Sequence, residues 1–124
     1  MSLLKLFYAL FKIKLLTPLG IYRLVSAVLK CGTNIMALLT FSTKVYGDKV
    51  ALVDDNEILS YNELLIQTKR LATILIQKYK LGKGMKIAFL CKNHASLVKG
   101  LFSATLLGTD VYMLNAEMSI EQFN

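Results

Sequence analysis

The stretch "KIAFLCKNHASLVKGLFSATLLGTDVYML", residues 86–114, decides the fold of this chain. Its first six residues are a nearly continuous apolar run, which predicts a strand covered on both faces. Asn93 is a good helix cap, and we expect a helix over 94–107 that stops at Gly108. Residues 110–114 then form the next strand. Strand, helix and strand with short joints predict a βαβ unit with parallel strands, and therefore the α/β class.

The joint after the first strand carries the residues that could do chemistry. Cys91 and His94, with the distant Cys31, would give zinc only three ligands without the paired spacing of structural sites. As a nucleophile and its base, Cys91 and His94 have no orienting acid nearby in the sequence. We favour a structural joint, in which Cys91 ends the strand, Asn93 caps the helix and His94 lies in its first turn. The sequence therefore assigns no catalytic, cofactor-binding or metal-binding residue.

Working back towards the N-terminus, residues 50–55 and 57–60 predict two short strands joined by a turn at Asn56. Ser60 and Glu63 have the spacing of a capping box, and Leu59 and Leu64 can form the hydrophobic staple around it. These signals predict a helix over 61–79.

The predicted helix has a clear apolar face. The residues that keep the three-and-four spacing, and that we expect to be buried, are Leu64, Leu65, Thr68, Leu71, Ala72, Leu75 and Tyr79. After it, Gly82-Lys83-Gly84 lacks the longer glycine spacing and the Lys-Ser/Thr ending of a phosphate-binding loop, and it leads into a strand. We predict a turn there.

Charge is distributed unevenly along the chain. Of the 15 basic residues, six lie in residues 1–46, where there is no acidic residue, so the remainder has nine basic and eight acidic residues. The basic residues of the N-terminal part are set among leucines, which argues against a nucleic-acid partner and favours an anionic lipid surface. The two cysteines lie sixty residues apart and form no disulfide framework, so a reducing cytoplasm is expected.

Residues 1–46 predict two or three apolar, basic helices. Lysines interrupt every candidate spanning segment, and no signal-peptide cleavage site follows. Lys5 and Lys12 share one helix face, and Thr17 and Pro18 suit the cap and first residue of a second helix. Helices with narrow basic stripes and broad apolar faces fit a bilayer interface. The alternative is that they pack on a larger protein body.

The last residues contain a second helix-start signal. Ser119 and Gln122 form a capping box, with Met118 and Phe123 placed as its staple. Only about one turn follows before Asn124, too little to offset the cost of helix nucleation. This pattern predicts that these residues begin a larger protein.

Residues 45–124 together resemble the start of the adenylate-forming superfamily, specifically acyl-CoA synthetases, and the hydrophobic residues 19–39 resemble the N-terminal regions of its bacterial long-chain fatty-acid members. The resemblance is carried in order by Tyr46-Gly47-Asp48, Leu59–Leu64, Gly84–Ala88, Asn93 and Leu107–Thr109. It implies an incomplete parallel βαβ layer of an adenylate-forming N-domain over residues 47–124, preceded by the hydrophobic basic helical segment 1–46. Many relatives have Val-Pro after the aromatic of the last strand, whereas Met113-Leu114-Asn115 follow Tyr112 here. That variant is similar to long- and very-long-chain enzymes.

The resemblance also implies a reaction. Such enzymes join a carboxylic acid to the α-phosphate of ATP with Mg²⁺, and coenzyme A then displaces AMP. The family's phosphate loop is rich in Ser, Thr and Gly and ends in Pro-Lys, but the only proline here is Pro18. The family's catalytic positions therefore have no counterpart in this chain, which we expect to be inactive alone, with none of these cofactors bound.

Three functions remain open from the sequence. The first is the N-terminal portion of a fatty-acid–CoA ligase, cytoplasmic, with peripheral attachment to the inner face of the membrane as an option. The second is a stand-alone, membrane-associated remnant that acts as a binding module. The third is an unrelated Rossmann-like nucleotide binder, which is weakened because no glycine fingerprint follows Val53 or Leu90.

Overall fold

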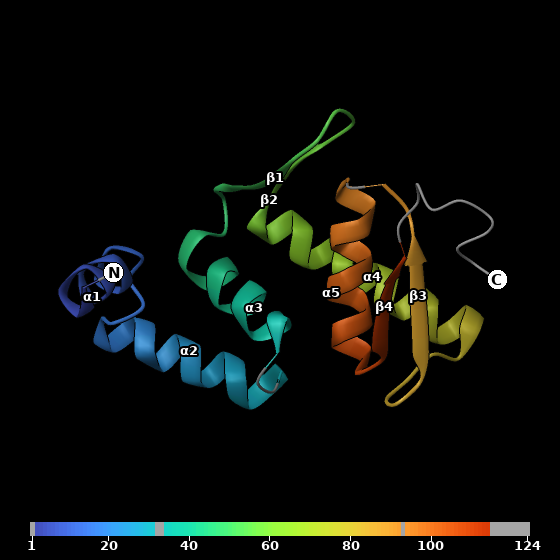
Figure 1. The fold of residues 1–124 in the computed structure, drawn as a ribbon, viewed down its shortest axis with the longest axis horizontal. Helices are drawn as coiled ribbons and strands as arrows, with labels where there is room; N and C mark the ends of the chain where they lie inside the picture. The colour runs from blue at the N-terminus through green and yellow to red at the C-terminus, as the bar shows by residue number, and fades with distance from the viewer. Residues whose placement is uncertain (1, 32–33, 93, 115–124) are drawn as a thin grey trace.

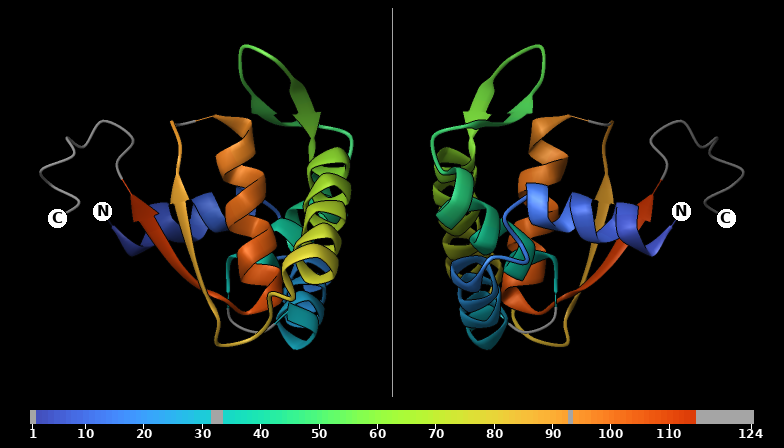
Figure 2. Two further views of the ribbon diagram at one scale, coloured as in Figure 1. Left: turned by 90° about the vertical axis from the view of Figure 1, so that its right-hand side faces the viewer. Right: turned by 90° about the vertical axis from the view of Figure 1, so that its left-hand side faces the viewer.

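Helix α5 (Ala95–Leu107) joins two parallel strands, β3 (Lys86–Leu90) and β4 (Asp110–Leu114), as the sequence predicted. A computed structural model describes residues 2–31, 34–92 and 94–114 (Figure 1). The strands pair in register from Lys86 opposite Asp110 to Leu90 opposite Leu114. Helix α5 lies between this sheet and helix α4 (Tyr61–Tyr79) (Figure 2). The molecule thus has a layer of strands, a central helix and an outer layer of helices.

Two features of this βαβ unit differ from expectation. His94 is the N-cap of α5, because its Nδ1 accepts a hydrogen bond from the Ser96 N–H at 3.3 Å, so it precedes the first turn. The expected cap, Asn93, lies outside the described residues. The prediction that β3 is covered on both faces is wrong for the described residues. Leu90 is 58% exposed, and exposure alternates along the strand. Helix α5 covers one face only.

The helix α4 begins and ends where the sequence indicated. Ser60 Oγ accepts from the Glu63 N–H at 3.2 Å, and Glu63 Oε2 accepts from the Ser60 N–H at 2.8 Å, which confirms the capping box. Leu64, Thr68 and Ala72 are buried along one face. Tyr79 is 57% exposed, so its predicted burial is wrong, because the last turn of α4 extends beyond α5 (Figure 1).

Strands β1 (Val50–Val53) and β2 (Ile58–Ser60) form the predicted antiparallel pair, which projects from one end of the molecule (Figure 1). Three helices precede it: α1 (Leu3–Lys12), α2 (Pro18–Cys31) and α3 (Ile35–Tyr46). Helix α2 starts at Pro18 as predicted, and Thr17 Oγ1 caps it by accepting from the Gly20 N–H at 3.0 Å. The predicted capping box of Ser119 and Gln122 lies outside the described residues.

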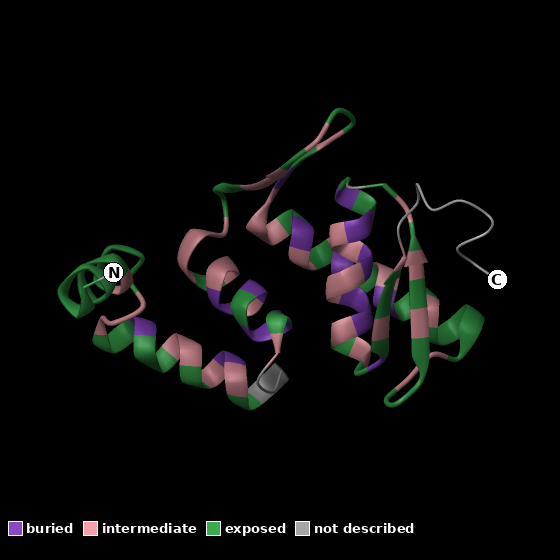
Figure 3. Cartoon of the chain, in the orientation of Figure 1, coloured by how far each residue is buried: buried purple, intermediate pink, exposed green. Residues whose placement is uncertain are grey.

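Two apolar clusters hold the helices together. The larger contains Met36 and Leu39 of α3 with Leu59 and Leu64, and it fixes α3 against α4. The smaller contains Ala27, Ala37 and Phe41 and joins α2 to α3. Helix α1 has no buried residue. The three N-terminal helices therefore differ: α3 is part of the core, α2 is packed on one side, and α1 is almost entirely exposed (Figure 3).

Candidate functional site

The junction between β3 and α5 is a structural joint. Cys91 comes directly after the last residue of β3 and its thiol is free and half-buried. The His94 carbonyl accepts from the N–H groups of Leu97 and Val98 at 3.0 and 3.4 Å, as a helix cap should. His94 Nδ1 is already engaged with the first turn of α5. An imidazole held in this way acts as the cap of the helix.

Asp54 is the residue of this region that sequence reasoning missed. It follows β1, and one carboxylate oxygen accepts from the N–H groups of Asn56 and Glu57 at 2.8 and 2.9 Å. The other oxygen accepts from the Ala95 N–H at 2.8 Å, forty-one residues away, at the start of α5. Only the local half of this arrangement, an Asx turn before Asn56, has a signal in the sequence.

These hydrogen bonds alter the acidity of the carboxyl group. The backbone N–H of Ala95, followed by those of Asn56 and Glu57, holds the pKa of Asp54 below its ordinary value of 3.8. Donors directed at a carboxylate favour its charged form, and the start of a helix adds a partial positive charge. Nearby His94 lowers the pKa further by a smaller amount. The charged Asp54 side chain therefore links the β1–β2 hairpin to the start of α5 through hydrogen bonds.

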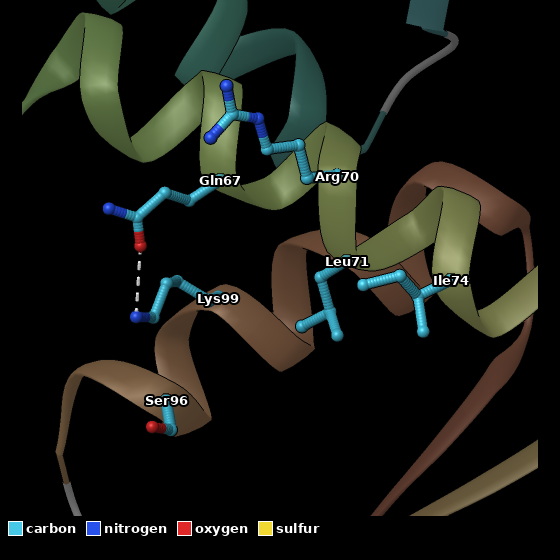
Figure 4. Close-up of a pocket in the computed structure, with 6 residues that line it drawn as sticks. All are labelled: Gln67, Arg70, Leu71, Ile74, Ser96 and Lys99. Carbon is cyan, nitrogen blue, oxygen red and sulfur yellow. Dashed lines mark hydrogen bonds between the residues drawn. The ribbon is translucent and has the colours of Figure 1, made fainter.

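A hollow of about 390 Å³ lies between α4 and α5, lined by Gln67, Arg70, Leu71, Ile74, Ser96 and Lys99 (Figure 4). Lys99 Nζ donates to Gln67 Oε1 at 3.0 Å and forms an ion pair with Glu57 Oε1 at 2.6 Å. The amine is thereby neutralised by groups from α4 and the hairpin. No nucleophile paired with a base lies among these lining residues, so the hollow offers a surface for packing or binding and no evident chemistry.

The described residues contain no group of three or more His, Cys, Asp and Glu side chains able to hold a metal ion. Gly82-Lys83-Gly84 is the predicted turn: the Met85 N–H donates to the Gly82 carbonyl at 3.1 Å, and the Gly84 N–H donates to the Gly108 carbonyl at 3.0 Å. Both amide groups therefore donate to carbonyls within the fold.

Comparison with known proteins identifies the family to which this fold belongs. The profile of the AMP-binding enzyme family matches residues 39–124, from the middle of α3 through β4. The chain belongs to this family.

Individual relatives give a more specific similarity. The chain is 28% identical over 75 residues to 2-succinylbenzoate–CoA ligase from Bacillus velezensis, which covers 60% of this chain and 15% of the relative. The chain therefore spans less than a quarter of the lengths of the proteins it matches.

Solved structures share the fold. O-succinylbenzoate coenzyme A synthetase (MenE) from Bacillus subtilis, in complex with ATP and magnesium ion, has a TM-score of 0.64 and 26% identity, covering 68% of this chain and 23% of that one. The N-terminal subdomain of NpsA from Klebsiella oxytoca also has a TM-score of 0.64, with 23% identity, covering 69% and 22%. The βαβ unit with its flanking helices is therefore the N-terminal subdomain architecture of adenylate-forming enzymes.

Proposed function

We propose that this chain forms the N-terminal part of an acid–CoA ligase, which activates a carboxylic acid with ATP and Mg²⁺ and transfers the acyl group from AMP to coenzyme A. The observation that carries the proposal is the family match over residues 39–124, supported by the similarity to a CoA ligase and to a CoA synthetase. Residues 47–124 begin the synthetase domain, and residues 1–46 are a helical segment in front of it.

The role of these residues in the ligase is architectural. The transition state of adenylate formation places negative charge on phosphate oxygens, which must be stabilised by fixed donors and cations. Because the described residues offer no such arrangement, these groups belong to other parts of the enzyme. We expect residues 1–124 alone to catalyse no adenylate formation.

The identity of the acid substrate is a more specific part of the proposal. The ligase from Bacillus velezensis and the synthetase from Bacillus subtilis are named for 2-succinylbenzoate, whereas we infer a long-chain fatty acid for this protein. The inference is supported by Tyr112-Met113-Leu114-Asn115, which resemble long-chain enzymes, and by the apolar character of residues 1–46.

Pyrophosphate exchange tests the activity and the substrate. The endogenous gene product, given labelled pyrophosphate, should incorporate label into ATP when palmitate is supplied, and much less with 2-succinylbenzoate. The reverse preference would refute the fatty-acid assignment and keep the ligase. Exchange with neither acid, in a protein that binds no ATP, would refute the ligase.

A second function is favoured by one observation, the exposure of α1. A stand-alone, membrane-associated binding module would use such a helix without any catalysis. The intact mass of the endogenous product separates the two: a mass near 13.9 kDa supports the module, and a mass several times larger supports the ligase.

A further inference from the structure

We propose that helix α1 and the loop after it bind the surface of an anionic lipid bilayer. The proposal is independent of the ligase activity, because it rests only on the N-terminal helices. Leu4, Phe7 and Phe11 follow the three-and-four spacing along α1 and are 82, 54 and 62% exposed. Side chains of this size are rarely left in water as a contiguous helix face without a partner. This set of three is called the α1 face below.

The helix lies away from the core that would otherwise cover it. Figures 1 and 3 show α1 at the end of the α2–α3 pair that is distant from α4 and α5, with exposed residues along almost its whole length. It is tethered where it ends, since Tyr46 Oη donates to the Ile13 carbonyl at 2.9 Å. The structure thus divides the N-terminal segment: α3 packs on the protein body, and α1 is presented outward.

The loop after α1 adds a hollow with suitable chemistry. It measures about 500 Å³ and is lined by Tyr8, Phe11, Lys12, Lys14 and Thr17. Two ammonium groups beside two aromatic rings match the boundary of a bilayer, where a headgroup phosphate lies next to the acyl chains. The lining contains no carboxylate, so an anionic headgroup meets no repulsion there.

Charge favours lipid over residues 47–124 as the occupant. Residues 1–46 contain six basic and no acidic side chains, whereas residues 47–124 are nearly balanced, with nine basic and eight acidic residues. Residues 47–124 therefore offer no excess negative charge to complement α1, while the cytoplasmic leaflet does. The phosphate of a lipid headgroup and a free phosphate share this chemistry, but only the lipid also accommodates the α1 face.

The geometry requires attachment in the plane of the membrane. Ten residues of helix are only about 15 Å long, half of the hydrocarbon thickness. Among the described residues, no helix has the length and hydropathy needed to span a bilayer. An amphipathic helix of this kind inserts its apolar face below the headgroups and leaves the lysines at the phosphate level.

Vesicle sedimentation of the full chain tests whether the basic side chains contribute to lipid binding. Wild type should bind phosphatidylcholine vesicles that contain about a third phosphatidylglycerol, and bind pure phosphatidylcholine weakly. One lysine near such a surface is worth about a fivefold change in partitioning, so Lys12→Gln/Lys14→Gln should weaken binding about 25-fold. Lys78→Gln/Lys80→Gln is a matched control, since Lys14 and Lys80 are both in the left-handed backbone region just after a helix. It should leave binding unchanged.

Tryptophan fluorescence tests whether the apolar side chains of the α1 face enter the bilayer. The chain has no Trp, so Phe7→Trp gives a single reporter on the α1 face, and Tyr79→Trp gives one on an exposed site of α4. Anionic vesicles should shift the emission of Phe7→Trp to shorter wavelength and leave that of Tyr79→Trp unchanged.

Four results would overturn the proposal. The first is equal binding to neutral and anionic vesicles, or no binding at all. The second is an equal loss of binding in the two lysine variants. The third is a Phe7→Trp emission that is already at short wavelength without lipid and does not move, which would show that protein covers the α1 face. The fourth is a Phe7→Trp emission that free inorganic phosphate shifts as far as vesicles do, which would assign the site to phosphate and exclude lipid.

Discussion

Asp54 connects two parts of the chain through a single carboxylate, and this has a consequence for stability. Its three backbone donors come from the turn after β1 and from the start of α5. Asp54→Asn keeps an acceptor oxygen but loses the charge and one oxygen, so the hairpin and α5 should separate more easily. We expect the melting temperature at neutral pH to fall by a few degrees.

The pH dependence of this effect has a defined sign. Because the folded-state pKa of Asp54 lies below 3.8, its stabilising contribution is complete above the ordinary pKa and is lost as pH falls through the lowered value. The difference in melting temperature between wild type and Asp54→Asn should therefore shrink on acidification from neutral pH to about pH 3. Asp55→Asn at the exposed neighbouring position is the control and should change little. A difference that grows in acid would contradict this account.

Gly100 provides a second prediction at the scale of one residue. It is buried in α5, and a Cβ there would lie 2.6 Å from Cε1 of the Phe89 ring. Gly-to-Ala changes within a helix usually stabilise by up to about 1 kcal/mol, but overpacking costs about 1–3 kcal/mol. We expect the overlap to dominate, so Gly100→Ala should lower the free energy of unfolding by about 1 kcal/mol in denaturant titration.

Two comparisons make the Gly100 prediction specific. Gly82→Ala has no atom within 4 Å of the added Cβ and should be neutral. In a Phe89→Leu background the ring is gone, so the cost of Gly100→Ala should be smaller. A stabilised Gly100→Ala would mean that β3 can shift away from α5 without loss.

At the scale of elements, the capping box of α4 sets where the longest helix begins. Ser60→Ala removes the acceptor for the Glu63 N–H and should cost about 1 kcal/mol of stability, measured by chemical denaturation. Hydrogen bonds from the Ser60 backbone N–H and then its hydroxyl hold the pKa of Glu63 below 4.5. The pKa of Glu63, followed by NMR, should therefore rise in Ser60→Ala. Ser60→Thr is the conservative control, and an unchanged free energy of unfolding in Ser60→Ala would show that the box is dispensable.

Local sequence signals explain why the helix boundaries could be predicted. Ser60, Gly108 and Pro18 each act through backbone geometry or a bond within three residues, so their effect is visible in the sequence. Gly108 has φ of 69°, the left-handed conformation that ends α5. The cap of α5 was misplaced because Asn93 and His94 can both fill that role, and propensity alone prefers Asn.

Long-range contacts could not be predicted from the sequence. The bond from the Ala95 N–H to Asp54 and the ion pair of Lys99 with Glu57 each join residues about forty positions apart, and no local pattern marks them. The same holds for Ser103, whose buried hydroxyl donates to the Thr68 carbonyl at 2.9 Å. Apolar composition also could not separate α3, which is in the core, from α1, which is exposed, because both are rich in large apolar side chains.

At the scale of the whole molecule, burial predicts a gradient of local stability. Buried residues are concentrated on α3, the first half of α4 and α5, whereas α1 has none. Local opening requires less free energy where few apolar contacts are lost, so amide exchange should be fastest in α1 and slowest around Leu64–Ala72 and Leu97–Ala104.

Hydrogen exchange read by mass spectrometry on the full chain checks this order. Without lipid, peptides from α1 should exchange nearly as fast as an unfolded chain, because a ten-residue helix without packing is marginal in water. Phe41→Ala, which empties the cluster that joins α2 to α3, should speed exchange in those two helices and leave α4 and α5 less affected. Protection of α1 equal to that of α4 would show that contacts outside the two described clusters hold α1, and that its exposed apolar face is not free to bind another surface.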